Sequence, residues 1–277
     1  MDLFTIQNMA NLGVLIFLQA VLGFDNLLYI SLESQKAPLE SQAKVRKIGI
    51  AIAVVLRVVL LFVMVQLIDA LKEPLFVLDW EGVVTGGFNF SSLVFLLGGG
   101  FIMYTAVKEI SHMLTIEHLS GAGTGTKPTK TTGQVIGMIV FMNLIFSFDS
   151  ILSALAITDV FLVLATAIVI SGLAMMFMAD AVSGFLEKNR KYEVLGMFIL
   201  LIVGIVLLGE GGQAAAHAND NHELALAFFG HEVIPMSKST FYFSIAVLVI
   251  VDIIQSKYQK KLDVERRLGD TNEVSAK

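Results

Sequence analysis

The sequence has no cysteine and few charged residues. Without cysteine, the 277-residue chain has no disulfide bonds, no thiolate metal site and no thiol redox chemistry. A bound metal would therefore need oxygen or imidazole ligands. Charged residues make up 16% of the chain, compared with roughly 25% in soluble domains. Together with 56% hydrophobic residues and a mean hydropathy of +0.78, this composition is typical of a polytopic membrane protein.

Motifs of several other protein classes are also missing from the sequence. There is no Ser/His/Asp set, phosphate-binding glycine loop or HExxH helix, so we expect neither an enzyme nor a bound cofactor. The basic residues are spread over several linkers, which argues against a nucleic-acid-binding surface. The N-terminal segment lacks the basic region of a cleavable signal peptide, so we expect the first apolar segment to be retained.

Long apolar segments indicate the fold class. A membrane-spanning helix needs about 20 residues. Segments near this length lie at 10–32, 48–71, 91–109, 134–157, 160–182, 194–210 and 240–257. The sequence therefore predicts an all-α polytopic protein of seven transmembrane helices, forming one domain over residues 1–277 with a cytoplasmic tail at 258–277.

An internal repeat places an aspartate inside two of these apolar segments. Shifting the numbering by 124 aligns residues 15–28, LIFLQAVLGFDNLL, with residues 139–152, IVFMNLIFSFDSIL, and matches Asp25 with Asp149. A charged side chain at the bilayer centre costs about 2.5 to 3.5 kcal/mol to insert, and such residues usually mark a transport pathway. The alternative is a structural role, in a hydrogen bond to a neighbouring helix or a salt bridge to Arg57.

Both aspartates have polar neighbours at the same spacing. An amide precedes each aspartate by six residues and a polar residue follows it directly: Gln19 and Asn26 in the first copy, Asn143 and Ser150 in the second. Six residues correspond to about 600° of helical rotation and about 9 Å along the axis. One aqueous cavity can contain both groups, and unwinding at Gly23 or Ser147 would bring them closer together.

Lysine and arginine are concentrated in alternate linkers. Of the 19 such residues, 16 follow the first, third and fifth apolar segments or lie in the C-terminal tail. By the positive-inside rule, we expect an N-terminus outside and a C-terminus in the cytoplasm.

The repeat and this topology together predict an inverted arrangement. Three segments at about 10–109 form the first repeat, a linker covers about 110–133, and three segments at about 134–210 form the second repeat. An odd number of crossings per repeat makes the two repeats run in opposite senses. Their aspartates would then meet near the midplane, where transporters built in this way bind substrate.

Several motifs, in order along the chain, resemble the TerC family of integral membrane proteins. They include LGFDNLLYISL, LLGGGFIMYTAVKEI ending in Glu109, and FSFDSILSALAIT. The resemblance implies a location in the bacterial inner membrane, export of a divalent metal ion, manganese above all, and a link to tellurite resistance. Its two acidic motifs fall on Asp25 with Asn26 and on Asp149 with Ser150.

The chain departs from the family pattern at two positions. Gln19 and Asn143 replace acidic residues that manganese-exporting relatives typically have six residues before each aspartate. Mn²⁺ favours carboxylate oxygens, and two aspartates alone just balance its charge. The candidate metal ligands are thus the two aspartates with Asn26 and Asn143, and weaker binding or another substrate is expected.

Two further charged residues are candidates for the pathway. Arg57 lies within the second apolar segment and either acts as a counter-charge in the binding site or extends to the cytoplasmic boundary. Glu109 lies close to the end of the third segment, where a carboxylate is more often solvated than functional.

Three functions remain open from the sequence. The first is a divalent-metal exporter that works by alternating access, with membrane lipids and the transported ion as its partners. The second is a scaffold or metal-delivery protein in stress or tellurite resistance that moves no solute. The third is an exporter of a small organic cation or amino acid, in which the aspartates would pair with an amino group. The sequence also leaves open a homo-oligomer or other membrane-protein partners.

Overall fold

The computed structural model describes residues 5–80, 82–119, 130–189, 191–219 and 221–275. Within these ranges, the side chains at positions 21, 24, 25, 68–71, 112–119, 191, 259–260 and 262–275 are outside the description. The chain divides into two compact units, residues 1–235 and residues 236–277.

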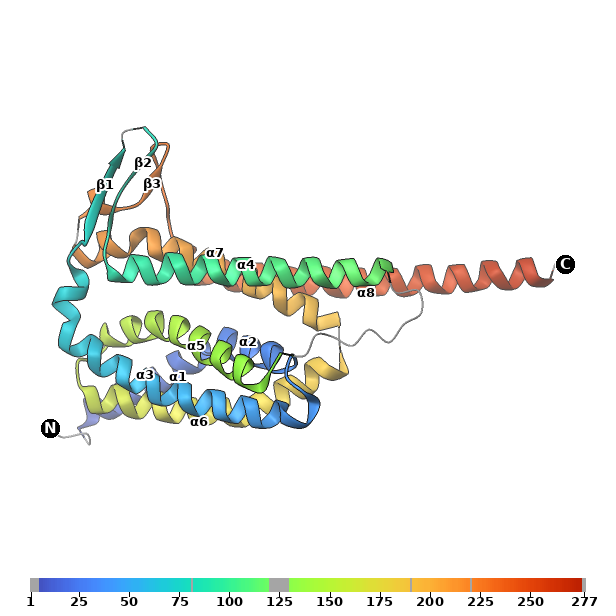
Figure 1. Cartoon of the computed structure of the whole chain (residues 1–277), viewed down its shortest axis with the longest axis horizontal. Coiled ribbons are helices and arrows are strands. Elements are labelled where there is room, and N and C mark those ends of the chain that lie inside the picture. Colours follow the sequence, from blue (N-terminus) through green and yellow to red (C-terminus); the bar gives the residue numbers. More distant parts are fainter. Residues whose placement is uncertain (1–4, 81, 120–129, 190, 220, 276–277) are drawn as a thin grey trace. The chain divides into compact units, whose positions relative to one another are not determined.

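The described residues of the first unit form seven α-helices and a small sheet (Figure 1). The helices are α1 (Ile6–Leu22), α2 (Phe24–Ser34), α3 (Gln42–Lys72), α4 (Phe90–Leu119), α5 (Thr132–Leu155), α6 (Phe161–Lys188) and α7 (Lys191–Asn219). Short 3₁₀ turns lie at Leu39–Ser41 and His222–Leu224. The second unit consists of α8 (Lys238–Ser275), which continues well beyond the predicted end at residue 257.

The predicted all-α membrane fold is confirmed. Among the described residues, six helices are long and apolar enough to cross a bilayer: α3 to α8. The first predicted segment differs, because it is not one continuous helix. It is divided at Gly23 into α1 and α2, and its apolar helix at Ile6–Ala20 is shorter than the other six.

Gly23 lies at a crowded point, which explains why a glycine is found at this break. A Cβ atom here would lie 2.8 Å from the carbonyl oxygen of Gln19 and 3.0 Å from Cε of Met175 on α6. Glycine is also a poor helix former, which lowers the cost of interrupting the helix. No such interruption occurs at Ser147, the other predicted point of unwinding, because α5 is continuous from Thr132 to Leu155.

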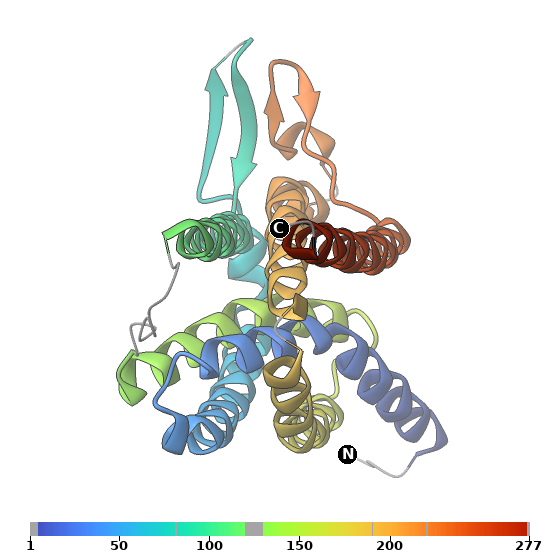
Figure 2. The same cartoon turned by 90° about the vertical axis from the view of Figure 1, so that its right-hand side faces the viewer.

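The two sets of three spans run in opposite senses, as predicted for an inverted repeat (Figure 1). Each helix packs against its counterpart in the other repeat: α2 against α5, α3 against α6, and α4 against α7. Figure 2 shows α4 and α7 side by side, above the layer that contains α2, α3, α5 and α6. Leu27, Ile30, Ile50 and Ile139 are central to the core between the helices of this lower layer.

Glycines allow the closest of these contacts. A Cβ on Gly99 of α4 would lie 2.8 Å from the carbonyl oxygen of Gly204 on α7, and Gly98 contacts Ile145 of α5. Small residues permit such close approach between helices in a bilayer. Of the three consecutive glycines in α4, Gly98 and Gly99 thus lie at helix contacts, whereas Gly100 has no atom within 4 Å of its Cβ position.

A four-stranded antiparallel sheet was not predicted from the sequence. It consists of β1 (Phe76–Trp80), β2 (Val84–Phe88), β3 (Ala227–Phe228) and β4 (His231–Glu232), in that order. The pairs Val84 with Phe228 and Thr85 with Ala227 join the two hairpins. The sheet therefore ties the linker after α3 to the linker after α7, and these two linkers lie on the same side of the first unit.

Candidate functional site

Buried polar side chains surround the break at Gly23. Gln19 precedes the break on α1 and is 2% exposed, and Asn26 follows it on α2 and is 1% exposed. Gln19 Nε2 donates a hydrogen bond to the carbonyl oxygen of Ser150 on α5, at 3.4 Å. Asn26 Nδ2 contacts Sδ of Met175 on α6, at 3.9 Å. The polar residues of the first repeat thus point toward helices of the second repeat.

Arg57 joins the same cluster from α3. Its guanidinium Nη2 donates to the hydroxyl of Ser150 at 2.7 Å, and the side chain is 4% exposed. Ser150 therefore contacts both Gln19 and Arg57. Of the two predicted positions for Arg57, the structure places the guanidinium inside the protein against α5.

Asn143 and Ser147 continue the cluster along α5. The hydroxyl of Ser147 donates to the carbonyl oxygen of Asn143 and lies 3.2 Å from its Oδ1. Asp149 is half-buried in the same helix. Asp25 is the second residue of α2, directly after the break, and its side chain lies outside the described residues.

Several polar atoms in this cluster have no hydrogen-bond partner among the described residues. They are Gln19 Oε1, Asn26 Oδ1 and Arg57 Nε. An unsatisfied buried polar atom costs about 1 to 3 kcal/mol. The two amide oxygens are the kind of neutral ligand that hard cations accept. Among the residues whose side chains are described, no group of three His, Asp or Glu forms a candidate metal site.

Glu109 lies in a separate cluster, between the C-terminal end of α2 and α4. The ammonium group of Lys36 is 2.9 Å from Glu109 Oε2 and 3.1 Å from Glu33 Oε2. Lys130 Nζ is 2.7 Å from the other oxygen of Glu33. Glu109 is thus ion-paired, which differs from the simple solvated carboxylate that its position near a span end suggests.

Lys36 remains a cation within this cluster. Burial lowers the pKa of its ammonium group, but the adjacent carboxylates of Glu33 and Glu109 outweigh that effect, and the net pKa is raised above its ordinary value of 10.5. Hydrogen bonds to the same two carboxylates add to the increase.

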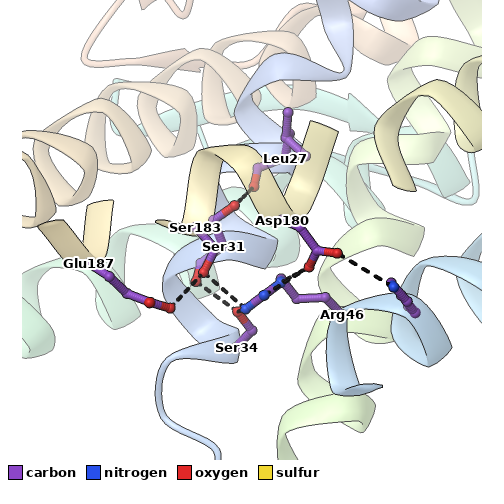
Figure 3. A network of polar contacts seen from close by, with 8 residues as sticks. Leu27, Ser31, Ser34, Arg46, Asp180, Ser183 and Glu187 are labelled. Carbon is purple, nitrogen blue, oxygen red and sulfur yellow. Dashed lines mark hydrogen bonds and ion pairs between the residues drawn. The ribbon is translucent and has the colours of Figure 1, made fainter. Parts of the chain in front are cut away.

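A third polar network joins α3 and α6 at the same end of the unit (Figure 3). Nε and Nη2 of Arg46 donate to Asp180 Oδ1 at 3.0 and 2.8 Å. Nη1 of Arg46 donates to the hydroxyls of Ser34 and Ser183, at 3.2 and 3.0 Å. Ser34 ends α2, so Arg46 connects three helices from both repeats.

Several of these residues were not predicted from the sequence. Glu33, Ser147 and Met175 belong to the clusters but were not predicted as site residues. One available signal was the position of Glu33, an acidic residue directly after the apolar segment 10–32. The pairing of Lys36 with Glu109, 73 residues apart, carries no signal in the sequence.

The fold and the buried polar cluster define a polytopic α-helical membrane protein built from an inverted repeat. The chain belongs to the TerC family of integral membrane proteins, whose family model matches residues 4–262.

Curated relatives agree with this membership. The UPF0053 inner membrane protein YgdQ of Escherichia coli (strain K12) is 32% identical over 199 residues, covering 72% of this chain and 80% of the relative. The UPF0053 inner membrane protein YoaE of the same organism is 30% identical over 204 residues, covering 73% of this chain and 38% of YoaE. No solved structure matches the chain. Together with the apolar helices, these names indicate a multi-pass inner membrane protein.

Proposed function

We propose that this protein is a transporter that exports a divalent metal cation, Mn²⁺ foremost, from the cytoplasm. The cation would bind between α1–α2 and α5, at Asp25 and Asp149, and would leave when the two inverted repeats change their relative position. Broken helices near the midplane are a recurrent feature of transporter binding sites.

The observation that carries this proposal is the cluster of buried polar groups around the Gly23 break. Gln19 Oε1 and Asn26 Oδ1 are buried oxygens without hydrogen-bond partners among the described residues. They lie on the helix segments that flank Asp25. A cation bound there would satisfy these oxygens, which offsets part of its own dehydration.

The guanidinium of Arg57 would serve as a counter-charge at the transport site. In the absence of a cation, it would supply positive charge beside Ser150, the residue that follows Asp149 in the sequence. When a cation binds, repulsion would weaken the contact of Arg57 with Ser150. Arg57 thus acts as a tethered counter-charge that favours release of the ion.

Transport and its direction are tested together in everted membrane vesicles. An exporter whose N-terminus lies outside would move Mn²⁺ into these vesicles. We expect uptake with the wild type and a loss of at least about tenfold with Asp149→Asn, because the site loses its charge balance. The matched control is Asp159→Asn, which changes an exposed aspartate after α5. Equal uptake by the Asp149→Asn and Asp159→Asn vesicles would refute the proposed site.

A second candidate is export of a small organic cation, and the charge of Arg57 favours it. Asp25, Asp149 and Arg57 together carry a formal charge of −1, which matches a singly charged amine better than a divalent ion. Adding primary amines at excess to the vesicle assay separates the two candidates, since an amine substrate would abolish Mn²⁺ uptake or replace it. If the wild type moves neither Mn²⁺ nor an amine, the chain is a scaffold or delivery protein.

A further inference from the structure

The pocket between α2, α4 and α7 contains a second group of oxygen-bearing side chains. Tyr29, Glu33, Thr105 and Glu109 line it with oxygen atoms, and the Lys36 side chain lies among them with apolar residues of α2, α4 and α7. Its volume of about 20 Å³ is enough for one water molecule. The polar cluster at Gly23 contributes none of the residues that line this pocket.

The hydroxyl of Tyr29 is the first observation that points to a ligand in this pocket. Tyr29 is 5% exposed, and its hydroxyl has no hydrogen-bond partner among the described residues. Buried tyrosine hydroxyls usually find a partner. The unpaired hydroxyl lines the same pocket as the two carboxylates.

The position of Lys36 is the second sign. Its ammonium lies between Glu33 Oε2 and Glu109 Oε2, at 3.1 and 2.9 Å. Two carboxylates from different helices therefore converge on one cation. The Lys36 side chain is 23% exposed, so it can move toward solvent without crossing the core. Glu33, by contrast, is 4% exposed, and without Lys36 its Oε2 loses its cationic partner, while its Oε1 still pairs with Lys130.

We propose that Glu33, Glu109 and the Tyr29 hydroxyl form a second cation site, in which the Lys36 ammonium occupies the position of a divalent metal ion. The three side chains offer only oxygen ligands, which suits Mn²⁺ or Mg²⁺. The small pocket fits one compact ion better than Ca²⁺, which takes six to eight ligands.

The charge of Lys36 competes with a metal ion for the two carboxylates of this site. The charges of Glu33 and Glu109 are balanced by those of Lys36 and Lys130, and Lys130 pairs with Oε1 of Glu33. When Lys36 leaves, Oε2 of Glu33 and Oε2 of Glu109 are free, and the two carboxylates offer two negative charges to an ion in the pocket. A divalent ion then replaces the ammonium. This proposal rests on the proposed function in two respects. The choice of Mn²⁺ as the ion comes from it, and so does the role of the second site, which would receive the ion on its way from the cytoplasm to the transport site.

Direct Mn²⁺ binding to the purified full chain tests the second site. The electron paramagnetic resonance signal of free Mn²⁺ gives the number of bound ions and their affinity. We expect Lys36→Gln to bind one more Mn²⁺ than the wild type, with an affinity at least about tenfold higher at this site, because a competing positive charge is removed. The gain should disappear in Lys36→Gln/Glu109→Gln and fall about fivefold in Lys36→Gln/Tyr29→Phe, which loses one oxygen ligand.

The matched control is Lys47→Gln. Lys47 also pairs with a carboxylate, Asp180, but it is 59% exposed and lies outside the pocket. This variant should bind Mn²⁺ as the wild type does. An equal gain in Lys47→Gln, no gain in Lys36→Gln, or a gain that survives Glu109→Gln would each overturn the inference.

The Asp149→Asn background separates the second site from the proposed transport site. If Mn²⁺ binding of the wild type depends on Asp149 while the Lys36→Gln gain does not, both proposals stand. A gain without any Asp149-dependent binding supports the second site alone. If Lys36→Gln does not fold, the wild type is measured at millimolar Mn²⁺ instead. It must then show a weak Mn²⁺ site that Glu109→Gln removes, and a wild type without such a site refutes the inference.

Discussion

Arg46 and Asp180 form an ion pair, and replacing Asp180 should lower the free energy of unfolding more than replacing Arg46. The pair joins α3 to α6, and Arg46 also binds two serine hydroxyls (Figure 3). The side chain of Arg46 is 8% exposed, whereas that of Asp180 is 41% exposed. Water can therefore replace a lost partner for the aspartate but not for the arginine.

The exposed fractions of Arg46 and Asp180 set the expected loss in the free energy of unfolding for each variant. Asp180→Asn leaves a buried guanidinium without its carboxylate, a change that costs about 3 to 5 kcal/mol in fully buried pairs. We expect the lower end, about 3 kcal/mol, because water partly screens this pair. Arg46→Met leaves a hydrated carboxylate that still has Lys47 at 3.6 Å. The loss is then limited mainly to the hydrogen bonds to Ser34 and Ser183, about 1 to 2 kcal/mol.

The free energy of unfolding of the purified protein, measured by denaturant titration in mild detergent, checks this order. Lys47→Met is the control, and it should change stability by less than about 0.5 kcal/mol because the residue is 59% exposed. The double variant Arg46→Met/Asp180→Asn should cost less than the sum of the single changes. If Arg46→Met costs as much as Asp180→Asn, the reasoning from exposure is wrong.

Three further predictions concern packing, topology and pH. Gly99→Ala should destabilise the protein by about 1 to 3 kcal/mol, because the new Cβ would lie 2.8 Å from a carbonyl oxygen of α7. Gly100→Ala, whose Cβ would meet no atom within 4 Å, should be neutral or slightly stabilising in the same denaturant titration. Because the chain has no cysteine, single cysteines report topology: a membrane-impermeant thiol reagent should label His231→Cys in intact cells, and Lys44→Cys only after permeabilisation. The pKa of Lys36 is raised on folding, so the stability it contributes is fully present below its ordinary value of 10.5 and is lost as the pH rises through the higher folded pKa. The difference in stability between wild type and Lys36→Gln should then shrink only in strongly alkaline buffer, and a decrease between pH 7 and 9 would contradict it.

The site could be predicted from the sequence only in part. The repeat identified Gln19, Asn143 and Ser150 as polar residues inside apolar segments, because such residues stand out against their neighbours. The break at Gly23 was one of two expected positions, and the tight contact with Met175 that accompanies it comes from α6, a distant part of the chain. The contact between Arg57 and Ser150 depends on the rotation of α3 against α5, which no local pattern specifies.

The sequence by itself determined the membrane class, the span boundaries to within a turn or two at most ends, the inverted repeat and the TerC family. These properties follow from hydrophobic length and from local motifs, which add up along the chain. Only the tertiary structure decided the partners of the buried and partly buried charges. Lys36 pairs with Glu109 and Arg46 with Asp180 over separations of 73 and 134 residues. Such pairing depends on which helix faces meet, and in a low-dielectric interior the partner determines whether a buried charge is tolerated.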